Sequence, residues 1–173
     1  MRYLRRACLT LNPNQGPSAA LAVPGPAFET GADWMGGHLV RLRGRPMPAP
    51  VPRPNFTAYG WLKYGLSMSG FGMAAWAVGC ISYWLLPLAE LGFYLVEIQF
   101  LFLFPLLLEG GPAPLRRSCR LTARIGYGRC LAGVLPVAAY MLAGLLRPGR
   151  ARRQWHVGCL AILLWYVDET PAA

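Results

Sequence analysis

The chain has 173 residues, of which 55% are hydrophobic and only 14% are charged, whereas soluble domains carry roughly 25% charged residues. Its net charge of +10 comes from sixteen arginines and a single lysine, Lys63. Many of the arginines lie between apolar blocks, which is typical of membrane proteins and argues against nucleic-acid binding.

The first 57 residues contain nine prolines and six glycines, a composition typical of disorder. We therefore expect residues 1–57 to be disordered and residues 58–173 to form a membrane-embedded helical domain. Proline occupies every second position from Pro46 to Pro54. This spacing predicts a stiff polyproline II spacer, and a ligand for a proline-recognition domain is the alternative.

The first apolar block, Gly65–Leu88, is long enough to cross a bilayer, because its 24 residues would rise about 36 Å as a helix. Small residues recur along one face and form a stripe where another helix can approach closely. This small-residue stripe consists of Gly65, Gly72, Ala75, Gly79 and Ser82.

The second block, Leu91–Leu108, begins just after Pro87–Glu90, and this short interval predicts a tight helical hairpin. The block contains Glu97 and Gln99, and an unpaired polar group at such a depth costs about 2.5–3.5 kcal/mol. The two side chains point nearly opposite ways on a helix. We therefore expect this helix to be central, with protein neighbours on two sides.

Glu90, Tyr94 and Glu97 share one helix face, so they can be read as a proton or cation relay. The structural reading is that Glu97 is protonated or hydrogen-bonded and fixes the helix register. We favour the structural reading, because no second acid or base lies opposite Glu97 in the apolar blocks. The expected partners of Glu97 are another subunit, an arginine at a helix end, or one of Ser67, Ser69, Ser82 and Tyr140.

A basic segment separates the second and third blocks. It is either a short helix on anionic headgroups or an ordinary positive loop, and both readings place its arginines at the membrane surface. The arginines assigned to this surface are Arg116, Arg117, Arg120 and Arg124.

The third block, Cys130–Leu146, is marginal in length and is interrupted by Pro136. The fourth, His156–Val167, has 12 residues and suits an interfacial or re-entrant helix better than a span. Counting basic residues on each side of these blocks predicts a cytoplasmic N-terminus.

No catalytic residue is predicted, because the chain lacks G-x-S-x-G, H-E-x-x-H and C-x-x-C motifs. Five scattered cysteines and two distant histidines give no metal-ligand spacing, so neither a metal nor a cofactor is expected.

The predicted fold class is all-α: a small polytopic integral membrane protein with a helical hairpin and one or two further spanning or re-entrant helices. The favoured function is an accessory or assembly subunit that packs against a larger complex, or against copies of itself, in a bacterial inner membrane. The alternatives are a small oligomeric proton, ion or solute transporter that uses Glu90 and Glu97, and an intramembrane enzyme.

Overall fold

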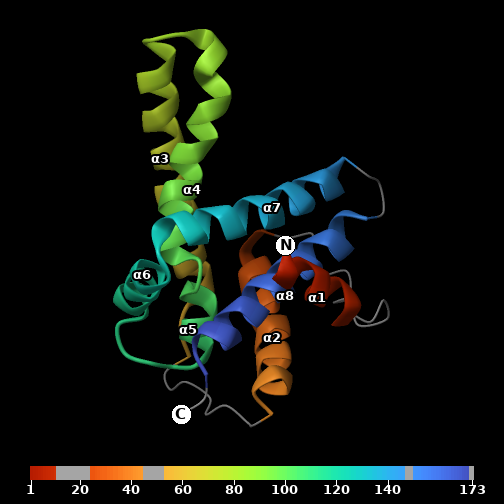
Figure 1. The fold of residues 1–173 in the computed structure, drawn as a ribbon. Helices are drawn as coiled ribbons and strands as arrows, with labels where there is room; N and C mark the ends of the chain where they lie inside the picture. Colours follow the sequence, from red (N-terminus) through yellow and green to blue (C-terminus); the bar gives the residue numbers. More distant parts are fainter. Residues whose placement is uncertain (11–23, 45–52, 147–149, 172–173) are drawn as a thin grey trace.

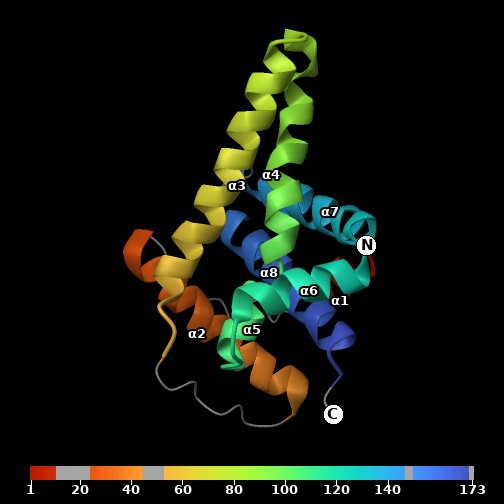
Figure 2. The ribbon, with the colours of Figure 1, turned by 90° about the vertical axis from the view of Figure 1, so that its left-hand side faces the viewer.

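The computed structural model describes residues 1–10, 24–44, 53–146 and 150–171, and every regular element in these ranges is helical. The all-α fold class is therefore confirmed for this part of the chain. Two parts are evident in Figures 1 and 2, a long helical hairpin that projects from the molecule and a helical body at its base.

The hairpin is built from α3 (Phe56–Gly79), the 3-10 helix η3 (Tyr83–Ala89) and α4 (Glu90–Glu97). Asn55 caps α3, because its side chain accepts a hydrogen bond from the Ala58 backbone at 2.9 Å. The turn of the hairpin lies at residues 80–82, earlier than the expected turn at 87–90. The predicted span Gly65–Leu88 therefore contributes to both arms and is not one helix.

The two arms meet at a pair of glycines that lie outside the small-residue stripe. A Cβ on Gly92 would lie 2.6 Å from the Gly70 carbonyl oxygen and 2.5 Å from the Cβ of Ala74. Such an approach is possible only without a side chain. Gly65 and Gly72 have no atom within 4 Å of the position a Cβ would take, so the arms do not use the predicted stripe.

The second apolar block changes its helical form before its end. After α4 the chain forms the short 3-10 helix η4 (Ile98–Phe100) and then α5 (Leu103–Leu108). The carbonyls of Ile98 and Gln99 at this break accept hydrogen bonds from Thr122 (2.7 Å) and Ser118 (2.8 Å). Both hydroxyls belong to α6 (Pro114–Ile125), which is thereby fixed against the break.

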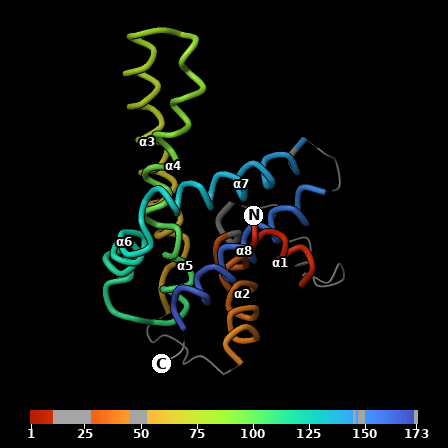
Figure 3. The backbone as a smooth tube through the Cα atoms, viewed as in Figure 1, coloured from red at the N-terminus to blue at the C-terminus, as the bar shows by residue number. Residues whose placement is uncertain are grey.

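The body is organised around α8 (Ala151–Glu169), a helix with ten buried residues. It is longer than the predicted block His156–Val167 and lies in the core, where an interfacial helix was expected. The helix α7 (Tyr127–Leu145) continues through Pro136 and crosses the base of the hairpin, as Figures 1 and 3 show.

Two helices precede the hairpin, α1 (Arg2–Thr10) and α2 (Pro24–Arg43). The prediction of disorder is wrong for them, because they bury Ala7, Ala32 and Leu39 in the cores of the body. The overall composition does not predict this burial, because a few apolar side chains on one face can stabilise a helix once a neighbouring helix covers them. The predicted polyproline spacer falls mainly outside the described residues.

Candidate functional site

The partner of Glu97 is Lys63, the single lysine of the chain. Its Nζ lies 2.7 Å from Oε1 of Glu97, and the two side chains are only 6% and 12% exposed. Ser67, one of the expected partners, donates a hydrogen bond to Oε2 of Glu97 at 3.3 Å. The glutamate is therefore met by a cation and a hydroxyl from α3.

Sequence reasoning missed Lys63 because it placed the hairpin turn too late. Lys63 and Glu97 each lie 17 residues from Cys80, on opposite sides of the observed turn, so antiparallel arms bring them level. A turn near Pro87 would instead place Glu97 opposite the end of α3. The correct register of the hairpin would have predicted the Lys63–Glu97 pair.

The other expected partners of Glu97 are engaged elsewhere or lie apart from it. Ser69 donates to the Gly65 carbonyl at 3.0 Å, and Tyr140 accepts a weak hydrogen bond from Cys8 at 3.8 Å. No hydrogen bond joins Glu90, Tyr94 and Glu97 to one another in the described part of the chain. Glu90 is exposed, whereas Tyr94 and Glu97 line one cavity.

Gln99 lies on the other side of the second helix, as expected from its angular position. Its side chain is half-buried, and its backbone carbonyl binds Ser118 of α6. The Glu97 side chain therefore meets α3, and the Gln99 backbone meets α6.

A cavity of about 600 Å³ lies beside the Lys63–Glu97 pair. Its walls come from α2, α3, α4, α5, α7 and α8, and most of the lining side chains are aromatic or aliphatic. Lys63 and Glu97 are the only aspartate, glutamate, lysine or arginine residues among the described lining residues. The ammonium also lies 5.3 Å from the ring of Tyr64 and 5.6 Å from that of Phe104, positions that favour a cation.

Two rings that line this cavity, Trp34 and His156, belong to a group of three that also includes His38. Trp34 lies between His38 and His156, with centroids 4.3 and 4.8 Å away. Burial lowers the pKa of both imidazoles from the ordinary 6.5, with a smaller contribution from Arg41 at His38 and from His38 and Arg152 at His156. Both histidines are therefore neutral at pH 7. Trp34 Nε1 is buried without a hydrogen-bond partner in the described structure.

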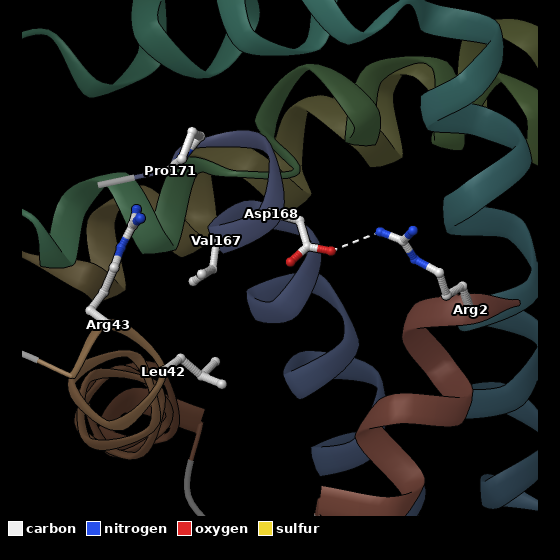
Figure 4. A pocket seen from close by; sticks show the side chains of 6 residues that line it. All are labelled: Arg2, Leu42, Arg43, Val167, Asp168 and Pro171. Atoms are coloured by element: carbon white, nitrogen blue, oxygen red, sulfur yellow. Dashed lines mark hydrogen bonds and ion pairs between the residues drawn. The ribbon is translucent and has the colours of Figure 1, made fainter. Parts of the chain in front are cut away.

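A second, polar corner lies at the C-terminal end of α8 (Figure 4). Arg2 and Asp168 line a hollow of about 500 Å³ and form an ion pair with an N–O distance of 2.8 Å. Arg43 pairs with Glu109 at 2.8 Å, and Tyr166 donates a hydrogen bond to the same carboxylate. Burial, followed by the Glu109 hydrogen bond, raises the pKa of Tyr166 well above its ordinary value. These contacts tie α1, α2 and α5 to α8, so the corner has a structural role.

The basic segment forms a short helix, α6, rather than a loop. One face buries Ser118, Leu121 and Thr122. The arginines predicted at the membrane surface are all exposed on α6, namely Arg116, Arg117, Arg120 and Arg124. One of them, Arg124, also donates to the Glu169 carbonyl at 2.7 Å.

The projecting end of the hairpin carries large apolar side chains in the open. Met73, Trp76, Tyr83 and Trp84 are 73–92% exposed. One helical stretch, Tyr83–Leu108, is long and apolar enough to cross a membrane, with 26 residues and a mean hydropathy of 2.0 over an 18-residue window. The pair α6 and α7 would count as a second only if its bend of 101° were accepted within one span.

Comparisons with protein-family models, with curated proteins and with solved structures found no match to this chain.

Proposed function

We propose that the protein is a membrane-embedded accessory or assembly subunit, and that the projecting hairpin is the part that enters the bilayer and meets a partner. The observation that carries this proposal is the exposure of large apolar side chains along the hairpin, including Trp76 and Trp84. Soluble monomers rarely display a contiguous apolar surface larger than a few hundred Å².

The charge distribution along the hairpin supports insertion. No charged residue occurs from Tyr64 to Ala89, and the charges that flank this interval are Lys63 and Glu90. Serine is the most polar residue in the interval, and Ser69 bonds to its own helix. Such a segment can enter hydrocarbon without an unpaired ion.

The small-residue stripe supports a helical partner. The positions of Gly65, Gly72 and Gly79 have open space where a Cβ would stand, whereas the arms pack on each other through Gly70 and Gly92. A stripe of small residues lets another helix approach closely in a bilayer. The partner is a further subunit or a second copy of this chain.

Membrane entry can be tested with Trp76→Asp, because Trp76 is exposed near the end of α3. We expect the variant to keep its helical circular dichroism and to lose most of its attachment to vesicles of phosphatidylethanolamine and phosphatidylglycerol. Leu9→Asp on α1, an exposed apolar position outside the hairpin, is the control. Attachment that survives Trp76→Asp would overturn hairpin insertion.

Partner binding can be tested by co-purification in mild detergent. Gly72→Leu should lose the partner, because the side chain fills the stripe. Ala77→Leu is the matched control, since Ala77 is exposed and lies about 140° around α3 from Gly72. A wild-type protein that purifies as a clean monomer would contradict the subunit proposal.

The transporter is the second candidate, because Glu97 and Lys63 place an acid and a base at the wall of one cavity. In this case, vesicles containing the protein should show proton or ion flux that Glu97→Gln abolishes. Flux that is unchanged by this substitution would remove Glu97 from the pathway. The inner-membrane location, the cytoplasmic N-terminus and multi-pass topology remain predictions from the distribution of arginine and apolar blocks.

A further inference from the structure

The cavity beside Lys63 has the volume of a ligand site. Pockets for small molecules enclose about 300–1,000 Å³, and this cavity encloses about 600 Å³. Six helices from the hairpin and the body contribute to the walls, so packed elements form the cavity, which is partly open to the surface near Trp61 and Trp155.

The walls indicate an occupant that is mainly hydrocarbon. The side chains that line most of the cavity are aromatic or aliphatic and come from different helices, among them Phe28, Phe93, Phe104, Val134, Val137 and Ile162. Water would find few hydrogen-bond partners there. A hydrocarbon chain would restore the dispersion contacts that an empty cavity forfeits.

The polar end of the cavity indicates the head group. The Lys63 ammonium has three donors, and Glu97 accepts one of them at 2.7 Å. The carboxylate also keeps acceptor capacity beyond its bonds to Lys63 and Ser67. A hydroxyl can accept from Lys63 and donate to Glu97, whereas a charged head group would compete with one member of a pair that is already neutralised.

We propose that this cavity binds an uncharged amphiphile with one long hydrocarbon chain, whose hydroxyl head group lies against the Lys63–Glu97 pair. Trp61 and Trp155 line the same cavity and are 62% and 41% exposed. Exposed indoles are typical of membrane interfaces. Binding of the ligand does not rest on the proposed subunit function. Only its entry from the bilayer rests on the proposed function, because this route requires the protein to lie in a membrane.

The proposal can be tested with hexadecanol that carries a photoreactive diazirine in its chain. The full-length protein in lipid nanodiscs is illuminated with this probe, and labelled peptides are identified by mass spectrometry. We expect labelling of α8 between Trp155 and Ile162, since these residues lie at the cavity. Excess unlabelled hexadecanol should suppress this labelling in the wild-type protein, and the absence of competition would overturn the proposal whatever the variants do.

Ala138→Trp should fill the cavity, because Ala138 lines it. We expect labelling of α8 to fall about tenfold or more, which corresponds to a loss of about 1.4 kcal/mol in binding. Ala139→Trp is the matched control, since Ala139 is the next residue on α7, is exposed, and does not line the cavity. Equal labelling of both variants would contradict the proposal.

The head group can be tested separately with Lys63→Met/Glu97→Leu, which removes both charges and leaves neither partner unpaired. This double variant should still be labelled by a diazirine-bearing hexadecane, but it should no longer prefer the alcohol to the alkane. Preferential labelling of wild-type protein by diazirine-bearing palmitate over the alcohol would overturn the uncharged head group. A missing partner in co-purification would contradict the subunit function and leave these results unaffected.

Discussion

The hairpin and the body are both rich in apolar residues, but they use them in opposite ways. In the body, α8 buries ten residues and forms the centre of the main hydrophobic cluster. In the hairpin, residues 60–93 contribute nothing to either hydrophobic cluster, and Trp76 and Trp84 remain in the open. Apolar content alone therefore does not distinguish a core helix from a surface that requires another environment.

The boundary between the two regions is marked by the Lys63–Glu97 pair. Below it, aromatic rings such as Phe28 and Phe104 pack between α2 and α5. Above it, the arms contact mainly each other through Gly70 and Gly92. Four predictions test this division between the hairpin and the body.

The largest effect on stability is expected at the boundary itself. Lys63→Met leaves the Glu97 carboxylate buried without its cation, so the free energy of unfolding should fall by about 3–5 kcal/mol. The measurement is urea unfolding in mild detergent, followed by tryptophan fluorescence. The double variant Lys63→Met/Glu97→Leu is the control and should remain near the wild-type value, because well-packed apolar residues can replace a buried pair.

A single variant as stable as the wild type would show that Glu97 is solvated or protonated in the folded protein. The boundary would then depend on packing alone.

A smaller effect is expected where the arms touch. Gly92→Ala places a Cβ 2.6 Å from the Gly70 carbonyl oxygen, and such overpacking costs about 1–3 kcal/mol. Gly72→Ala is the matched control on the open face and should be neutral or slightly stabilising, since alanine favours helix. Thermal unfolding of both variants decides the point, and equal melting temperatures would contradict the close approach of the arms.

The break between α4 and α5 should be less costly to disturb. Thr122→Val removes the hydrogen bond to the Ile98 carbonyl and should lower the free energy of unfolding by about 1–2 kcal/mol. Ser69→Ala, which removes an exposed bond within α3, should change it by less than about 0.5 kcal/mol. If both substitutions had the same effect in urea unfolding, α6 would not stabilise the break.

The smallest effect should come from pH in the body. The pKa values of His38 and His156 are lowered in the folded state, mainly by burial, so the unfolded chain binds more protons. Stability should therefore be fully present above about pH 6.5 and should fall as the pH decreases from there toward the folded pKa values. The melting temperature of the wild type should drop between pH 7.5 and 5.5.

His38→Gln/His156→Gln provides the control for this dependence. The double variant should show a shallower change in melting temperature over the same interval. An equally steep change would assign the dependence to other groups.

Several features of the candidate site could be predicted from residues alone. Glu97 in an apolar block requires a polar neighbour, and Ser67 was among those named. The angular separation of Glu97 and Gln99 predicted protein neighbours on two sides; the Glu97 side chain bonds to α3 and the backbone carbonyl of Gln99 bonds to α6. Such predictions are possible because helical geometry fixes side-chain directions over a few residues.

Other features depended on long-range register and were missed. The turn at residues 80–82 lies within a continuous apolar run, where no polar cluster marks it, so the pairing of Lys63 with Glu97 was not visible. The helices α1 and α2 were not predicted, because the proline and glycine content of residues 1–57 is typical of disorder. Their stability comes from contacts such as the stacking of Tyr3 on Trp165, 5.6 Å apart.

Local sequence patterns are enough to predict a helical protein, an uncharged segment from Tyr64 to Ala89, and a partner for Glu97. These properties follow from local periodicity and from the cost of burying a charge. The packing of the helices shows that Lys63 is this partner, that α8 lies at the core and that a cavity adjoins the pair. Each of these depends on how helices far apart in the chain lie against one another, which local sequence patterns do not encode.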